Sequence, residues 1–180
     1  MPTDKKYLLD ANVFIEAKRR YYAFDVCPGF WECLVWHHQG AYVQSIDRVK
    51  QELELGDDDL KNWIATVMPS TCFGSSDDGA VIGEYSQMQT WAQGHAQFSQ
   101  DAKAEFASKA DAWLVAYAKI KDLVLVTHEA PAPDSRRRVP IPSVCDTFNV
   151  PYVDTFVMLR DLEAKFHWLV PPQLDAGSTG

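Results

Sequence analysis

Acidic residues follow two apolar runs that each predict a buried strand. Asp10 comes directly after Tyr7-Leu8-Leu9, and Glu129 follows the apolar run 123–127 with one residue between. A parallel sheet brings the carboxyl ends of its strands to one edge, so both acids would meet there. Each also has an ordinary explanation, because Asp10 could start the next helix and Glu129 could be a solvated loop residue.

Two further acids lie in segments that predict helices. Asp111 precedes Leu114 and Val115 by three and four residues, which puts it on their apolar face. A buried carboxylate is costly unless it is paired or holds a metal. The alternative is a capping box with Ser108 as N-cap and Asp111 as the third helical residue. Glu52 follows Val49 by three residues, and its alternative is an ordinary surface glutamate.

The four acids together indicate a site for a divalent cation. Carboxylate oxygens are the ligands that Mg²⁺ and Mn²⁺ prefer. Like charges in one pocket repel each other unless a cation neutralises them. No histidine and cysteine set has zinc spacing, since His37 and His38 are adjacent.

The elements that would position these acids alternate between strands and helices. Short apolar strands of this kind are typical of a parallel sheet covered by helices on both faces, an α/β fold. Strands are predicted at residues 7–9, 41–43, 71–73, 123–127 and 152–153. Helices are predicted at residues 12–20, 29–38, 46–55 (with Ser45 as N-cap), 57–67, 77–93, 99–107, 109–121, 143–148 and 154–166.

Composition favours one globular domain. The chain has 180 residues, of which 47% are hydrophobic, and we expect a single domain over residues 1–168 and a disordered tail over 169–180. No apolar run approaches the roughly 20 residues needed to cross a bilayer, and no export signal is recognisable. The four cysteines contain no C-x-x-C pair. These features predict a cytoplasmic location and free thiols.

The net charge of −8 argues against a protein that coats nucleic acid with a basic surface. It is compatible with an enzyme that approaches nucleic acid through bound cations. Two basic runs, 18–20 and 136–138, could contact phosphates, with Arg19, Arg20, Arg136, Arg137 and Arg138 as the candidates. Their alternative is a solvated face. Among the aromatic residues, Tyr21 and Tyr22 could stack on unpaired bases, whereas Phe30 and Trp31 fit core packing better.

In the order and spacing of these residues, the sequence resembles a PIN domain, the fold of many metal-dependent ribonucleases. The resemblance covers about residues 5–166. It rests on the strand into Leu9-Asp10-Ala11-Asn12-Val13, the helix motif Val49-Lys50-Gln51-Glu52-Leu53, the helix start Asp111-Ala112-Trp113-Leu114-Val115-Ala116, and the strand 123–127 before an acid. Segments 21–25, 28–31 and 138–145 are similar to bacterial PIN toxins of the VapC type.

The resemblance implies a fold, a site and an activity. The fold would be a three-layer α/β/α sandwich with a central, mostly parallel sheet of about four to five short strands. Asp10, Glu52 and Asp111 carry over as metal-binding acids, and Asn12 matches a small polar position that orients the attacking water or the first acid. Glu129 stands where many PIN domains have aspartate. The cofactor would be Mg²⁺ or Mn²⁺.

We therefore expect an endoribonuclease that hydrolyses RNA phosphodiester bonds and leaves a 5′-phosphate and a 3′-hydroxyl. The resemblance also implies a structured RNA substrate such as tRNA, a cognate antitoxin protein, a capacity to form homodimers, and no membrane partner. One alternative is a non-catalytic PIN-like module that binds RNA or protein, which the glutamate at position 129 favours. A metal-dependent phosphatase would need a second aspartate where Asn12 stands.

Overall fold

The computed structural model of this protein describes residues 4–56 and 58–167. Its strands are β1 (Tyr7–Leu9), β2 (Val43–Ile46), β3 (Phe73–Gly74), β4 (Val124–Val126) and β5 (Tyr152–Val153). Its α-helices are α1 (Ala11–Glu16), α2 (Pro28–Gln39), α3 (Asp47–Glu54), α4 (Asp59–Thr66), α5 (Gly79–Gly94), α6 (Gln100–Ser108), α7 (Asp111–Lys121), α8 (Ile141–Phe148) and α9 (Thr155–Asp161). A π-helical turn, η1 (Ala17–Tyr21), follows α1, and a 3-10 turn, η2 (Ser70–Cys72), precedes β3.

The five strands form one parallel sheet in the order β3-β2-β1-β4-β5. The chain first builds outward from β1 through β2 to β3, and then returns to add β4 and β5 on the other side of β1. The direction of growth therefore changes between β1 and β4, which is where open α/β sheets hold their ligands. This topology confirms the predicted α/β sandwich with a parallel sheet of four to five strands.

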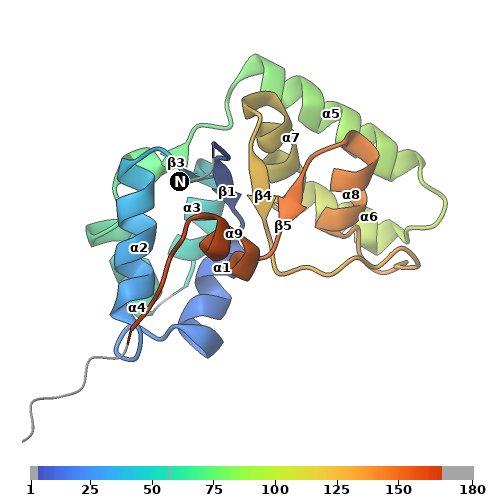
Figure 1. Ribbon diagram of the computed structural model, residues 1–180. Coiled ribbons are helices and arrows are strands. Elements are labelled where there is room, and N and C mark those ends of the chain that lie inside the picture. The colour runs from blue at the N-terminus through green and yellow to red at the C-terminus, as the bar shows by residue number, and fades with distance from the viewer. Residues whose placement is uncertain (1–3, 57, 168–180) are drawn as a thin grey trace, which may run out of the picture.

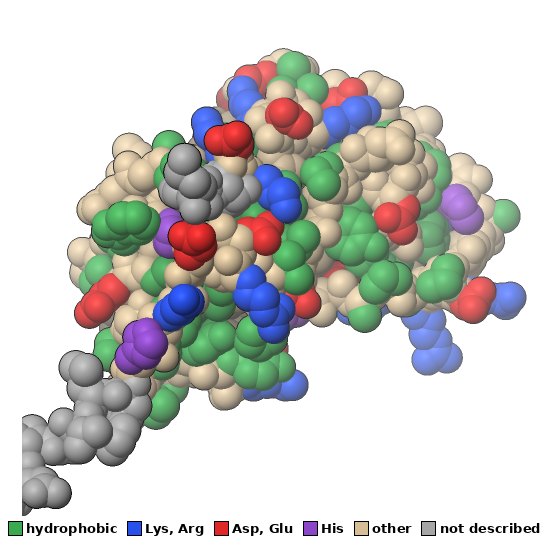
Figure 2. All heavy atoms as spheres, viewed as in Figure 1, with side chains coloured by type: hydrophobic (Ala, Val, Ile, Leu, Met, Phe, Trp, Pro, Cys, Tyr) green, Lys and Arg blue, Asp and Glu red, His purple; other side chains and the backbone are tan. Residues whose placement is uncertain are grey.

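Helices cover the sheet on both faces, as Figure 1 shows. Helices α1 to α4 and α9 lie on one side of the strands, and α5 to α8 lie on the other. Right-handed crossover connections require this division, because the two halves of the sheet grow in opposite directions. The outer surface carries acidic and basic side chains interspersed with each other on the face seen in Figure 2.

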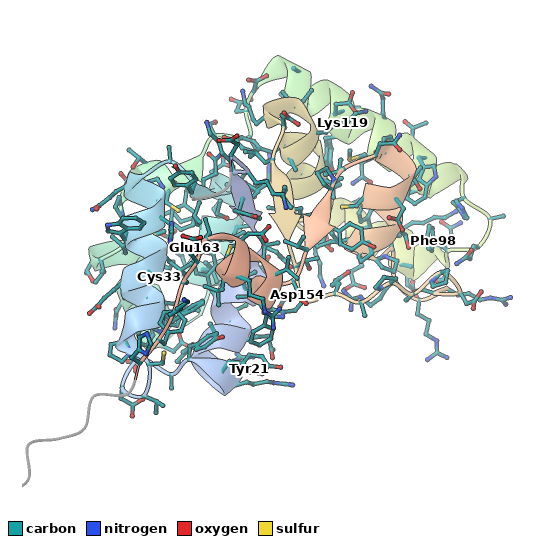
Figure 3. All side chains as sticks on the ribbon, in the orientation of Figure 1. Tyr21, Cys33, Phe98, Lys119, Asp154 and Glu163 are labelled. Atoms are coloured by element: carbon teal, nitrogen blue, oxygen red, sulfur yellow. The ribbon has the colours of Figure 1, made fainter. Side chains whose placement is uncertain are left out.

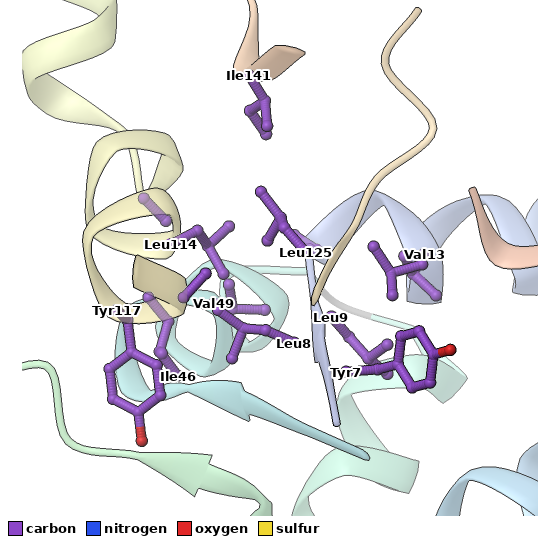
Figure 4. Packing of buried hydrophobic residues seen from close by; sticks show 14 of the residues in the cluster. Tyr7, Leu8, Leu9, Val13, Ile46, Val49, Leu114, Tyr117, Leu125 and Ile141 are labelled. Atoms are coloured by element: carbon purple, nitrogen blue, oxygen red, sulfur yellow. The ribbon is translucent and has the colours of Figure 1, made fainter. Parts of the chain in front are cut away.

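The central strand β1 is buried on both faces. Tyr7, Leu8 and Leu9 are all fully buried, and successive side chains of a strand point to opposite faces. Figure 4 shows Leu8 directed toward Leu114 of α7, and Tyr7 directed toward Val13 of α1. The strand is thus held between the two helical layers, and the residue that follows it, Asp10, has a fixed position.

The predicted start of α3 was wrong. Ser45 was expected to be an N-cap, but it lies inside β2 and is fully buried. Its hydroxyl donates a hydrogen bond of 2.7 Å to the carbonyl oxygen of Leu9. A serine side chain that can bond to a neighbouring strand is satisfied in the sheet as well as it would be at a helix start. Helix α3 begins at Asp47 instead.

Ser108 does not form the capping box that was the alternative explanation for Asp111. Ser108 is the last residue of α6, and α7 begins at Asp111 after Ala110, which provides no side-chain cap. Asp111 is therefore the first helical residue and not the third. The local explanation for this carboxylate does not hold in the structure.

Left-handed residues explain two further differences from the predicted boundaries. Ala41, with a φ of 60°, closes the turn after α2, so β2 begins at Val43 and not at residue 41. Glu163, with a φ of 56°, turns the chain after α9, so this helix ends at Asp161 and does not reach residue 166. The other predicted segments match elements of the same kind with shifted ends, except that the predicted strand 71–73 is mostly the η2 turn.

The remaining expectations concern the ends, the thiols and the membrane. All four cysteines are free; Cys72 and Cys145 are buried, and Cys27 and Cys33 are half-buried. Cys33 lies on α2, as Figure 3 shows. None of the described helices has the length and apolar character to span a membrane. The tail predicted at 169–180 lies outside the described residues.

Candidate active site

The carboxyl ends of β1 and β4 lie side by side. Leu9 pairs with Val126, so the two strands end at the same level. The backbone N–H of Asp10 donates to the carbonyl oxygen of Val126 over 3.1 Å. Asp10 and Thr127 therefore follow their strands at neighbouring positions on the same edge.

Asp10 is a buried carboxylate, with a residue exposure of 3%. Its Oδ2 accepts a hydrogen bond of 3.1 Å from the Thr127 hydroxyl. Burial raises the pKa of Asp10 to about 7, and repulsion from Asp111, Glu129 and Glu52 adds to this rise, while the Thr127 hydrogen bond opposes it. The other three acids thus all act electrostatically on Asp10.

Thr127 connects the acids that follow the two strands, a role that the sequence patterns did not predict. Its hydroxyl donates to Asp10 and accepts a hydrogen bond of 3.2 Å from the backbone N–H of Glu129. A threonine at the end of a strand, two residues before an acid, was the available signal. The hydroxyl has one proton to donate, and it goes to Asp10.

Asp111 reaches the same edge from α7. This helix precedes β4 and runs back along it, so its first residue lies near the carboxyl end of the strand. Burial raises the pKa of Asp111 to about 6; Glu129 and Glu52 raise it further, and Lys109 and Arg138 lower it. The described part of the chain supplies no hydrogen bond or ion pair to the Asp111 side chain.

Glu52 lies on the second turn of α3, the helix that follows β2. Its side chain is exposed, yet the surrounding protein keeps its pKa above its ordinary value, with Lys109 opposing the rise. Glu52 also raises the pKa of both Asp10 and Asp111. The charge of Glu52 therefore acts on the same two carboxylates.

Glu129 has both carboxylate oxygens engaged. Oε1 pairs with the guanidinium of Arg138, and Oε2 accepts a hydrogen bond of 2.8 Å from the backbone N–H of Ile141. Ile141 is the first residue of α8, so Glu129 also neutralises a helix N-terminus. Glutamate is one methylene longer than aspartate, and its carboxylate reaches both of these partners.

The four acids converge, but they do not form a ready-made ligand set. Over residues 4–56 and 58–167, no group of three or more His, Cys, Asp or Glu side chains is arranged to hold a metal ion. The donor chemistry nevertheless fits a hard cation, because Asp10 and Asp111 are largely buried carboxylates with few donors around them. Glu129 would have to leave Arg138 to become a ligand.

A cavity of about 510 Å³ opens beside this edge. Asn12, Glu129 and Arg138 line it together with Tyr21 and His128. Asn12 is half-buried on the first turn of α1. The predicted polar position at Asn12 thus shares a cavity with Glu129, and the aromatic residues at its wall were not expected to meet.

The predicted basic residues differ in their environments. Arg20 pairs with Glu16 at 2.8 Å, and Arg138 pairs with Glu129. Arg19, Arg136 and Arg137 are exposed, and no ion pair to them is found within the described residues. In Figure 2, one basic side chain projects from the lower right edge, beneath the loop between β4 and α8.

The predicted aromatic residues are mostly structural. Phe30 and Trp31 are buried, as expected for core packing. Tyr22 stacks on Phe30 with ring centroids 4.3 Å apart and an angle of 9° between the rings. Of the four residues considered, Tyr21 alone has its ring on the surface, with 49% of the residue exposed.

The fold defines this molecule as an α/β protein with a parallel sheet, and acidic residues gather at the carboxyl edge of that sheet. Residues 7–166 match the family described as "Domain of unknown function (DUF4411)", and the chain belongs to this family. No curated protein matches the chain.

Proposed function

We propose that this protein is a PIN-type endoribonuclease that depends on Mg²⁺ or Mn²⁺. The observation that carries the proposal is the convergence of Asp10, Glu52, Asp111 and Glu129 at the point where the sheet changes direction. Burial and mutual repulsion hold the pKa values of Asp10 and Asp111 at about 7 and 6. Such clustering of perturbed carboxylates is typical of functional sites.

The residues have distinct proposed roles. Asp10 and Asp111 would hold the main ion, and Glu52 and Glu129 would complete the ligand set or recruit a second ion. A bound ion would activate water and stabilise charge on the phosphate. Thr127 would keep the Asp10 carboxylate oriented. Asn12, at the wall of the cavity, would help to orient the water.

An assay on structured RNA tests the proposal. We expect cleavage with Mg²⁺ or Mn²⁺, and none with EDTA. Asp10→Asn should lower the rate by more than the roughly 10–100-fold typical of an outer-shell partner of a metal. Asp122→Asn is the matched control, because Asp122 is exposed at the opposite end of α7. Cleavage that survives both EDTA and Asp10→Asn would rule out the metal mechanism.

Metal binding has a readout apart from activity. Mn²⁺ should raise the melting temperature of the wild-type protein at pH 8, because it binds the folded state and neutralises repelling carboxylates. Asp10→Asn should reduce this rise, and Asp122→Asn should retain it. An equal rise in the wild-type protein and in Asp10→Asn would place the ion elsewhere.

We further propose that the protein acts in the cytoplasm as the toxin of a VapC-like toxin–antitoxin pair, that it has a cognate antitoxin, and that it self-associates as a homodimer. The segments similar to VapC toxins support this role. Expression of the wild-type protein should arrest growth, and expression of Asp111→Ala should not. Equal arrest by both would defeat the role of a toxic nuclease.

A second candidate function is a non-catalytic module that binds RNA or protein. The ion pair between Glu129 and Arg138 favours it, since this pair engages one of the four acids. RNA binding without any cleavage in Mg²⁺ or Mn²⁺, unchanged in Asp111→Asn, would support this alternative.

A further inference from the structure

Tyr21 is an exposed aromatic residue next to the acidic edge. It ends the η1 turn that continues α1, and half of the residue, 49%, faces solvent. Figure 3 shows it at the far end of the ribbon formed by α1 and η1. Its neighbour Tyr22 turns inward and stacks on Phe30, so the chain buries one of two adjacent tyrosines and leaves the other at the surface.

Two other rings hold Tyr21 in place. The His128 imidazole stacks against it with centroids 6.1 Å apart and an angle of 28° between the rings. Phe156 of α9 meets it edge-on at 5.8 Å and 79°. These contacts come from the loop after β4 and from α9. Segments far apart in the sequence therefore build one aromatic platform, which consists of Tyr21, His128 and Phe156.

His128 is itself fixed. Its Nε2 lies 3.0 Å from the hydroxyl of Thr155, and Thr155 is buried at the start of α9. This contact anchors the imidazole, which therefore supports the tyrosine as a flat and rigid surface.

The aromatic platform opens onto the candidate active site. Tyr21 and His128 line the same 510 Å³ cavity as Asn12, Glu129 and Arg138. Of the four acids, Glu129 lines this cavity, so a nucleotide whose phosphate lay near Glu129 would have an aromatic surface within the same cavity. Base stacking is tolerant of sequence and needs no positive charge on the protein, which suits a chain with a net charge of −8.

We propose that the aromatic platform is a binding site for one unpaired nucleobase of the RNA. This inference rests on the proposed ribonuclease function. It assigns Tyr21 as the stacking residue, with His128 and Phe156 as its supports. A base inside a duplex is stacked between its neighbours and has no free face for Tyr21.

A binding experiment tests the stacking without catalysis. A short single-stranded RNA with one 2-aminopurine is titrated with the protein in EDTA, and fluorescence quenching reports stacking of that base. We expect quenching with the wild-type protein and with Tyr21→Trp. Tyr21→Ala should lose the quenching and bind about 5- to 100-fold more weakly. Trp36→Ala is the control, because Trp36 is an exposed aromatic on α2.

Two outcomes would overturn the inference: equal binding by Tyr21→Ala and the wild-type protein, or equal affinity for the single strand and its duplex. Circular dichroism of Tyr21→Ala identifies a variant that fails to fold, and His128→Ala then provides a second test with the same expected direction. Quenching that depends on Tyr21 without any cleavage in Mn²⁺ would support the aromatic platform and contradict the proposed ribonuclease function. Cleavage with the same rate in the wild-type protein and in Tyr21→Ala, together with equal binding, would support the ribonuclease function and contradict the platform.

Discussion

At the scale of single residues, one hydroxyl organises the centre of the site. The Thr127 hydroxyl accepts a hydrogen bond from the backbone N–H of Glu129 and donates one to the Asp10 carboxylate. Asp10 is thereby held in one orientation although burial and neighbouring charges disfavour its ionised form. The arrangement keeps a carboxylate that destabilises the folded protein, which is typical of sites retained for function.

The pKa of Asp10 predicts how stability depends on pH. A carboxyl whose pKa rises on folding, here from 3.8 to about 7, binds its proton more tightly in the folded state. Its contribution to stability therefore falls as pH increases from about 4 to 7. Asp10→Asn should remove this pH-dependent loss of stability and stabilise the protein at pH 8. The gain should be at most about 4 kcal/mol, because one unit of pKa shift corresponds to roughly 1.4 kcal/mol.

Urea unfolding at pH 5 and pH 8, without divalent ions, measures this difference. The gain from Asp10→Asn should be larger at pH 8 than at pH 5. Asp122→Asn should show little change at either pH, because Asp122 is exposed. A gain that does not grow with pH would contradict the perturbed pKa of Asp10.

Thr127→Val tests the connection itself. Valine keeps the shape but leaves the Glu129 N–H without its acceptor and removes the donor to Asp10. We expect a loss of about 1–3 kcal/mol in the free energy of unfolding. Thr147→Val is the control, since the exposed Thr147 hydroxyl donates a hydrogen bond to Ser143 within its own helix. This substitution should cost less than about 0.5 kcal/mol. Equal losses in both variants would show that Thr127 has no special role.

At the scale of elements, the edge strand β3 depends on a close contact with α7. A Cβ added to Gly74 would lie 2.2 Å from the Tyr117 hydroxyl oxygen, and Tyr117 is itself buried. Space, and not backbone conformation, therefore requires a glycine at this position. The contact sets how closely α7, which carries Asp111, approaches the sheet.

A pair of glycine variants measures this contact. Gly74→Ala should destabilise the protein by about 1–3 kcal/mol through overpacking, and Tyr117→Phe in the same chain should recover part of the loss. Gly83→Ala is the matched control in the middle of α5, where an added Cβ meets nothing within 4 Å. It should stabilise the protein by about 0.5–1 kcal/mol. Thermal unfolding would contradict this account if Gly74→Ala were as stable as Gly83→Ala.

The sequence predicted the elements better than their ends. The period of the apolar residues and the short apolar runs identified the strands and most helices, because those patterns follow from burial. Ser45 was misplaced because a hydroxyl that bonds across the sheet looks the same in sequence as an N-cap. The end of α9 was misplaced because the left-handed residue after it is Glu163 and not a glycine, so the sequence contains no signal for the turn.

The site was predictable only in part, for a similar reason. Strand ends and the start of α7 indicated Asp10, Asp111 and Glu129, since topology brings these positions to one edge. The partner of Glu129, Arg138, and the stacking of Tyr21 on His128 are contacts between loops and helix ends. No periodicity specifies such contacts, and they depend on the packed structure.

At the scale of the whole molecule, the net charge of −8 bears on the proposed binding of RNA. Of the five candidate arginines, Arg19, Arg136 and Arg137 are exposed and have no ion pair in the described part of the chain. Three phosphate contacts predict a slope of about −2 when the logarithm of the association constant for single-stranded RNA is plotted against that of salt concentration.

Replacing both Arg136 and Arg137 by alanine should make that slope shallower by about 1.4. Lys121→Ala is the control, because Lys121 ends α7 away from the carboxyl edge. Filter binding at several salt concentrations gives both slopes. A slope near −6 for the wild-type protein would mean a much larger basic surface than the one described.

The position of β4 in the sheet has a consequence for biosynthesis. This strand lies between β1 and β5 and carries Thr127 and Glu129 just beyond its end, yet some 115 residues separate it from β1 along the chain. A ribosome that has released only the first two thirds of the polypeptide has made Asp10, Glu52 and Asp111 but has not yet released Thr127 or Glu129. For the proposed ribonuclease, we therefore expect the nascent chain to be inert toward RNA until β4 has inserted between β1 and β5 and has brought Glu129 to the other acids.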